Sequence, residues 1–128
     1  MSQPIILPFP NSLFVCEGCI GFSGKTDLVN IFNAIHPPGY PYLQKLFVVY
    51  ARLSQGLGHI PFFVEIHLAK TQQLIHVTNT FTLNFPDRDK TVEMALNMPN
   101  IPFPQAGLYL VQLYLDNKWA CECTLQLL

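Results

Sequence analysis

Apolar residues in this chain come in short runs that alternate with polar residues and are separated by prolines and glycines. The clearest run covers residues 60–69, where every even-numbered residue is apolar. Because successive side chains of a strand point to opposite faces, this run predicts a strand with one buried face. That face would contain Phe62, Val64, Ile66 and Leu68.

The whole pattern predicts an all-β protein, a single antiparallel β-sandwich, immunoglobulin-like or related, of about eight strands. Residues 26–35 have some helical spacing, but their β-branched and aromatic content favours a strand with an irregularity near Asn30. An extended, proline-rich lead-in (residues 1–11) would precede the sandwich domain (residues 12–128). The other expected strands are residues 13–20, 43–54, 60–69, 74–85 and 91–98, and the two arms of a hairpin at 108–128.

Two short sequences near the end of the chain predict how strands are joined. Asp116-Asn117 would form a tight hairpin turn, because both residues tolerate positive φ. A proline-rich corner is expected at residues 99–107, and Gly107-x-Tyr109 at its end is typical of a tyrosine corner. In that motif the phenol hydroxyl binds the backbone of the preceding loop, so we expect a structural role for the tyrosine.

The run at residues 60–69 is expected to form a hairpin with residues 74–85, turning at 70–73. If the turn closes symmetrically, His67 lies directly opposite His76 on the polar face, with Glu65 nearby. Such a group could bind a transition metal weakly, form a pH-sensitive patch, or be solvated, and a one-residue change of register would separate the histidines. The returning strand would point Ile75, Val77, Phe81, Leu83 and Phe85 inward.

Composition and charge narrow the functional classes. The 128 residues are 50% hydrophobic and 12% charged, with a formal net charge of −1 and no basic patch. Nucleic-acid binding and a polybasic membrane anchor are therefore not expected. The start of the chain lacks a signal-peptide pattern, and no stretch is apolar over the roughly 20 residues of a membrane span. We expect a cytoplasmic protein whose cysteines are reduced.

Four cysteines, Cys16, Cys19, Cys121 and Cys123, have the number and type of ligands of a zinc site. However, a CxC pair in a regular strand holds its side chains about 7 Å apart, whereas thiolates on one zinc need about 4 Å. The second pair also shares its expected face with Trp119, which would place both in the core. Buried free thiols are therefore the expected state, with zinc and a disulfide as alternatives.

The sequence Gly24-Lys25-Thr26 ends like a phosphate-binding loop. That motif needs a glycine five residues earlier, where this chain has Cys19, and it must join a strand to a helix in an α/β unit. A turn between two strands is therefore expected at residues 21–25, with Gly18 as a bulge or bend in the preceding strand.

Several segments in this order resemble a family of small, uncharacterised bacterial proteins, a domain of unknown function. They are Val15-Cys16, Gly24-Lys25, "LVNIFNAI", "LFVVYARLS" and the closing "FPQAGLYLVQLYLDNKW". The resemblance covers residues 12–127 and implies a β-sandwich and a bacterial origin. It brings no activity and no functional residue.

No nucleophile, base and acid are grouped in the sequence, so an enzyme is not expected. The unusual amount of apolar character, for example in "IILPF" and "NIPF", favours a non-enzymatic protein-interaction or assembly module. A protein partner or a homo-oligomer follows from that interpretation, and no cofactor is needed. The alternative is a metal- or small-ligand-binding sandwich that uses the cysteines or His67 and His76.

Overall fold

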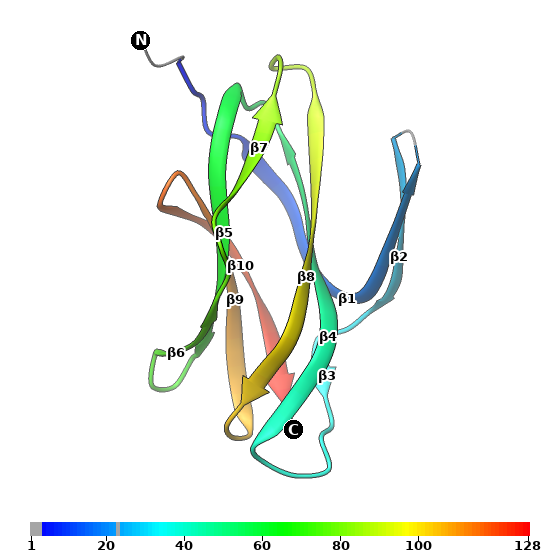
Figure 1. The fold of residues 1–128 in the computed structure, drawn as a ribbon, viewed down its shortest axis with the longest axis vertical. Helices are drawn as coiled ribbons and strands as arrows, with labels where there is room; N and C mark the ends of the chain where they lie inside the picture. The colour runs from blue at the N-terminus through cyan, green and yellow to red at the C-terminus, as the bar shows by residue number, and fades with distance from the viewer. Residues whose placement is uncertain (1–3, 23) are drawn as a thin grey trace.

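The computed structural model describes residues 4–22 and 24–128, which form two β-sheets packed face to face (Figure 1). The first sheet has the strand order β2-β1-β4-β8; the second has the order β3-β10-β9-β5-β6, and β7 also pairs with β5. The strands are β1 (Phe9–Phe22), β2 (Lys25–Ile31), β3 (Ala34–Ile35), β4 (Tyr42–Ser54), β5 (Gly58–Leu68), β6 (Gln73–Val77), β7 (Phe81–Phe85), β8 (Thr91–Phe103), β9 (Gly107–Leu115) and β10 (Lys118–Leu127).

The all-β sandwich is thus confirmed, with ten strands instead of about eight. The higher number arises because residues 26–35 and 74–85, each predicted as one strand, divide in two. The expected irregularity at Asn30 is present as a positive φ of 49°. Among the described residues, no helix is long and apolar enough to cross a membrane.

The core lies between the sheets, because alternate residues of each strand point inward. The four even-numbered residues predicted for the buried face of β5 are all buried. No polar or charged residue in the described chain is fully buried, so the interior is apolar throughout. Its largest fully buried side chains come from both sheets: Tyr109, Phe47, Phe85, Phe103, Leu53, Ile60, Ile66, Leu68, Met98, Ile101, Leu113 and Leu115.

The hairpin turn and the tyrosine corner predicted near the end of the chain are confirmed. Asp116 and Asn117 have φ values of 51° and 62° and join β9 to β10. Tyr109 is fully buried, and its hydroxyl donates a hydrogen bond of 2.7 Å to the carbonyl oxygen of Gln105. The polar end of a core tyrosine is therefore satisfied by the loop that it holds in place.

The corner predicted at residues 99–107 is mostly strand. β8 continues to Phe103 and remains paired with β4, leaving only residues 104–106 as a connection. The prediction was wrong because it treated the prolines as strand breakers. Proline cannot donate a backbone hydrogen bond, but in an edge strand its position can face the open side, where no such bond is needed. β8 is such an edge strand, and Pro99 and Pro102 lie in it.

One extra residue in β10 reverses the predicted position of Trp119. The register with β9 shifts between Trp119 and Cys121, so Ala120 has no partner on β9. Because the side-chain period of a strand is two, the shift places Trp119 beside Tyr114 on the outer face. The indole side chain is 55% exposed and does not enter the core as the sequence had predicted.

The return strand from the β5 hairpin is divided by residues 78–80. At this break a side chain takes the place of a backbone acceptor. The hydroxyl oxygen of Thr78 accepts a hydrogen bond of 3.0 Å from the backbone N–H of Val64. Leu83 and Phe85 are buried and Ile75 packs against the core, as predicted. The predicted inward positions of Val77 and Phe81 are wrong, since both are largely exposed beside this break.

The β1–β2 hairpin projects from the first sheet. β1 pairs with β4 up to Cys16 and from there pairs with β2 only. The register between β1 and β2 does not shift at Gly18, so β1 has no bulge there. The irregularity of β1 near this residue is instead the end of its pairing with β4 at Cys16. Gly24, with a φ of 83°, lies in the predicted turn, while Ser23 lies outside the described residues. We call residues 17–22 together with β2 the arm; Figure 1 shows it beside β4 and β8.

Candidate functional site

The four cysteines occupy two clusters on different sides of the first sheet. Cys16 is fully buried on the outer face of this sheet, and Cys19 of the arm packs against the same small cluster. Cys121 and Cys123 are partly buried and pack against the main core between the sheets. The four cysteines of the alternative zinc site are therefore not brought together in this structure. Nowhere in residues 4–22 and 24–128 do three His, Cys, Asp or Glu side chains form a group that could hold a metal.

Burial raises the pKa of all four thiols, and all four are free. For Cys123 burial is the largest cause and the neighbouring Cys121 and Glu122 add to it, so its pKa rises to about 11. A thiol with a raised pKa is protonated near neutral pH, which makes it a poor nucleophile and a poor metal ligand. The cysteines therefore act as small apolar side chains.

The predicted pairing of His67 with His76 is wrong. A register shift between Ile66 and His67 pairs His67 with Leu74 and places His76 opposite Ile66. Since Ile66 is buried, His76 shares the inward side of the sheet, and partial burial lowers the pKa of its imidazole. Only Glu65 stays beside His67, with 3.5 Å between Glu65 Oε2 and His67 Nε2.

The Gly24-Lys25-Thr26 sequence belongs to an antiparallel hairpin, which is not the strand-to-helix junction that a phosphate loop requires. Lys25 and Thr26 are already residues of β2. Thr26 has a different partner, because its hydroxyl donates a hydrogen bond to a carboxylate oxygen of Glu93 on β8. This contact connects the arm to the outer face of the first sheet.

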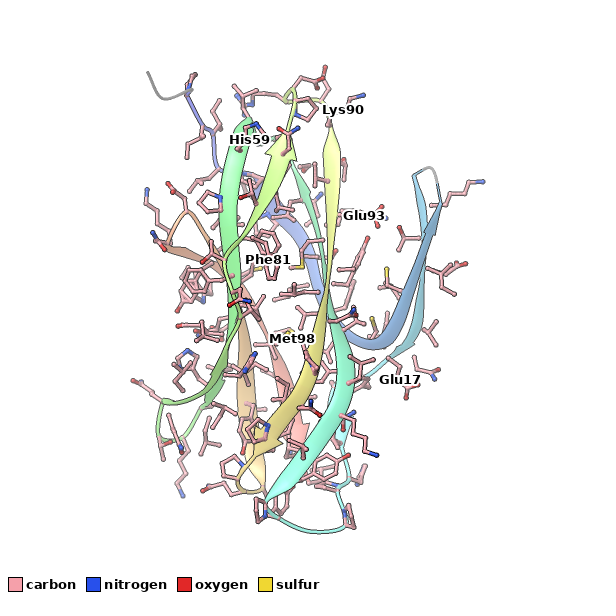
Figure 2. The ribbon with its side chains drawn as sticks, in the orientation of Figure 1. Glu17, His59, Phe81, Lys90, Glu93 and Met98 are labelled. Atoms are coloured by element: carbon pink, nitrogen blue, oxygen red, sulfur yellow. The ribbon has the colours of Figure 1, made fainter. Side chains whose placement is uncertain are left out.

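A cleft of about 300 Å³ lies between the arm and this outer face, with Glu93 in its lining. Glu93 Oε2 also accepts a hydrogen bond of 2.7 Å from the hydroxyl of Tyr50, and Oε1 lies 3.7 Å from the guanidinium of Arg52. The hydrogen bonds from Thr26 and Tyr50, and then the charge of Arg52, hold the pKa of Glu93 below its usual value. Figure 2 shows Glu93 on the side of β8 that faces the arm.

The outer face of the second sheet carries three cross-strand rows from β5, β9 and β10. Because cross-strand partners share a face, the register defines the rows directly. The first row is aromatic, the second is acid, amide and acid, and the third is mixed. We call this surface the aromatic–acidic face; its rows are Phe63, Tyr114 and Trp119, then Glu65, Gln112 and Glu122, then His67, Leu110 and Thr124.

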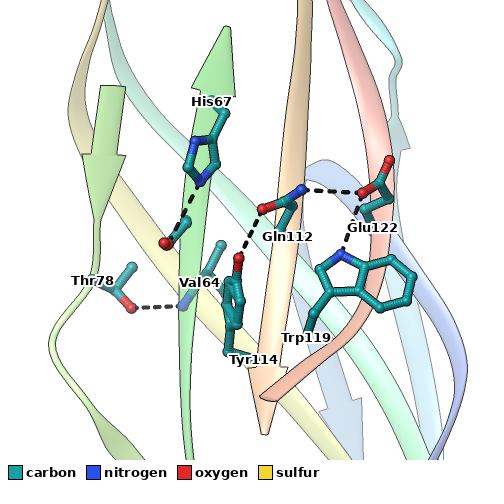
Figure 3. A network of polar contacts seen from close by, with 8 residues as sticks. Val64, His67, Thr78, Gln112, Tyr114, Trp119 and Glu122 are labelled. Carbon is teal, nitrogen blue, oxygen red and sulfur yellow. Dashed lines mark hydrogen bonds and ion pairs between the residues drawn. The ribbon is translucent and has the colours of Figure 1, made fainter. Parts of the chain in front are cut away.

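Hydrogen bonds join the first two rows (Figure 3). The hydroxyl of Tyr114 donates to Gln112 Oε1 at 3.1 Å, and Gln112 Nε2 donates to Glu122 Oε1 at 3.1 Å. The indole N–H of Trp119 reaches the same oxygen of Glu122 at 3.3 Å. The ring of Phe63 stacks on Tyr114, with 4.9 Å between ring centroids and 16° between planes. These contacts hold the exposed aromatic side chains in fixed positions.

Sequence reasoning missed both Glu93 and the aromatic–acidic face. The clean alternation in β5 did indicate that Phe63, Glu65 and His67 share an outer face. The position of Trp119 depends on one unpaired residue, which leaves no mark in the pattern of apolar residues. Glu93 meets its partners across strands far apart in the sequence, so no local signal could have identified it.

Fold and surfaces together define a class, an all-β sandwich of two sheets with a projecting hairpin arm. Within that class, the chain belongs to DUF6941, a family of unknown function, whose model matches residues 11–128. The resemblance to a domain of unknown function is thereby confirmed, while a bacterial origin stays a prediction. No curated protein matches the chain.

Proposed function

We propose that this protein is a non-enzymatic assembly module that pairs with a second copy of itself through the arm. The observation that carries the proposal is the surface of the arm that points away from the sandwich. There Ile20 and Val29 are exposed, and Ile31 is exposed at the base of the arm, where it pairs with Cys16. Beyond Cys16 the two strands of the arm pair only with each other. A two-stranded ribbon is marginally stable by itself, so covering this surface would stabilise it.

The charges on the same surface favour a second copy as the partner. Lys25 and Asp27 precede Val29 at alternate positions of β2, so their exposed side chains lie on the same side. A twofold axis through the arm would bring Lys25 of one copy near Asp27 of the other, and the reverse. Such self-complementarity is what an interface between identical surfaces requires.

The expected dimer is weak. Each of the three aliphatic side chains is about half exposed, and covering it would contribute roughly 1 kcal/mol, or about 6 kcal/mol for both copies. Association costs at least about 4 kcal/mol in lost translational and rotational freedom. The apolar surface and the two charge pairs, each worth up to about 1 kcal/mol, therefore support reversible pairing at about millimolar concentrations or above.

Sedimentation velocity over a concentration series tests this proposal. Ile20→Lys is expected to leave only monomer, because it places a charge in the apolar centre of the contact. Leu43→Lys is the matched control, since Leu43 and Ile20 are each 51% exposed and Leu43 lies on β4 outside the arm. A wild type that stays monomeric throughout, or equal effects of the two variants, would contradict the proposal.

A charge exchange tests the twofold arrangement itself. Asp27→Lys is expected to weaken the dimer about fivefold, because it places lysines of both copies together. The double variant Lys25→Asp, Asp27→Lys restores opposite charges across the axis and should regain most of the loss. If the double variant is as weak as the single one, the two copies do not meet in this way.

A further inference from the structure

The aromatic–acidic face has aromatic rings and carboxylates side by side, without a lysine or arginine. The strands place Glu65 and Glu122 on either side of Gln112, next to the aromatic row. The nearest lysine in the sequence, Lys118, is exposed at the start of β10 and pairs with Leu115, which is not a member of the three rows. The rows therefore contain two carboxylates, and their one basic side chain is His67 beside Glu65.

The acidic residues of the two outer faces differ in their partners: Glu93 on the first sheet has an arginine beside it, whereas Glu122 on the second sheet has none. Among the described residues, Arg52 lies 3.7 Å from Glu93 on the first sheet, and the corresponding contact on the second sheet is between His67 and Glu65. Glu122 has neutral donors only, the amide of Gln112 and the indole of Trp119, and both bind its Oε1. Its second oxygen is therefore available to a donor from another molecule.

The charges of Glu65 and Glu122 are both felt at the aromatic row. The pKa of Tyr114 is raised, first by desolvation and then by these two carboxylates. The phenol ring thus lies in the field of both acids. Aromatic rings are also negative over their faces, so rings and carboxylates here favour the same kind of ligand, a cation.

We propose that the aromatic–acidic face binds arginine side chains of an extended segment of a partner protein. A guanidinium is planar, so it can stack on the indole of Trp119 while its N–H groups donate to the free oxygen of Glu122. A lysine ammonium can use the charge but lacks the planar fork. The exposed Trp119 and the partly exposed Tyr114 are also residue types that contribute most at protein interfaces.

The spacing of the two carboxylates suggests the pattern of the bound segment. Glu65 and Glu122 lie on strands separated by β9, which corresponds to about 10 Å between strand axes. Alternate residues of an extended peptide point the same way and are about 7 Å apart. Arginines at alternate positions, with their long side chains, would therefore reach both carboxylates.

Trp119 is the one tryptophan of the chain, so its fluorescence reports on this face alone. The probe is a capped peptide of alternating arginine and glycine, and it is titrated into the full chain at low salt. Saturable change is expected with this peptide, about threefold weaker binding with lysine in place of arginine, and no binding with neutral citrulline. Affinity should fall as salt rises, because the contacts are exposed.

Glu122→Gln keeps an oxygen for the indole and amide donors but removes the charge, and we expect about fivefold weaker binding of the arginine peptide. Glu65→Gln provides the same test if the first variant does not fold, which thermal unfolding would reveal. Glu17→Gln is the control, because Glu17 is an exposed carboxylate that accepts a hydrogen bond from Asn30 on the arm. It should bind like the wild type.

Three results would overturn the proposal: equal binding of the citrulline peptide, wild-type affinity in both Glu122→Gln and Glu65→Gln, or saturation by a neutral oligosaccharide when the arginine peptide has no effect. Repeating the titration in Ile20→Lys separates this site from self-association through the arm. Binding that persists there supports the arginine site whatever the outcome of the sedimentation test.

Discussion

The two outer faces of the sandwich use similar residues with opposite results. On the first sheet a tyrosine hydroxyl binds a glutamate directly, and the arm covers the pair of Tyr50 and Glu93. On the second sheet Tyr114 and Glu122 are joined through Gln112 and stay open to solvent. Polar groups that are covered by the chain contribute to its stability, whereas polar groups left open are free to bind other molecules.

The largest expected difference between the faces comes from introducing a charge into each. Val48→Asp should lower the free energy of unfolding by about 3 kcal/mol, because Val48 is only 5% exposed under the arm and the new carboxylate would be buried unpaired. Leu108→Asp lies on the outer face of β9, where the side chain is 43% exposed, and should cost less than about 1 kcal/mol. Urea unfolding measures both; similar losses would mean that the arm does not cover its sheet in solution.

Removing one hydroxyl from each face gives a smaller and more specific effect. Tyr50→Phe deletes the hydrogen bond to the ionised Glu93 and should lower the free energy of unfolding by about 1.5 kcal/mol. Tyr114→Phe deletes a bond to a neutral amide that water can replace, with an expected loss of about 0.5 kcal/mol or less. If urea unfolding showed a larger loss of stability for Tyr114→Phe than for Tyr50→Phe, the covered face would not be the one that its polar groups stabilise more.

The smallest effect is a dependence on pH that belongs to the covered face. The pKa of Glu93 is below its ordinary value of 4.5 in the folded protein. Its ionised form therefore stabilises the fold above about pH 4.5, and this contribution is lost as the pH falls through the folded value. The free energy of unfolding of the wild type should exceed that of Glu93→Gln by about 1 kcal/mol at pH 7, and the difference should shrink as the pH falls below about 4.5. If this difference in the free energy of unfolding grew on acidification, the pKa of Glu93 would be raised and not lowered by folding.

The sequence predicted well wherever a local signal decides the structure. The hydrogen bond of Tyr109 to the preceding loop, the Asp116-Asn117 turn and the alternation in β5 all depend on residues within a few positions of one another. Each was confirmed, because backbone sterics and strand periodicity act over the same short range.

Where prediction failed, one residue of register or one distant contact was decisive. The unpaired Ala120 turned Trp119 outward, and a similar shift beside Ile66 separated the two histidines. Neither bulge alters the composition of its strand, so the sequence alone could not show it. The small cluster of Cys16 with Val48 and Tyr50 depends on how the arm folds back over β4, which is a property of the tertiary structure.

The strand edges determine how many copies an assembly can contain. Pro99 and Pro102 interrupt the outer edge of β8, and β3 at one edge of the second sheet has two residues. Open edges of this kind offer little to another strand, so neither promotes chain-to-chain addition. A self-complementary arm surface is buried in both copies once two of them pair, so it cannot bind a third copy. In the proposed dimer, the stoichiometry would therefore be closed at two, without growth into fibres.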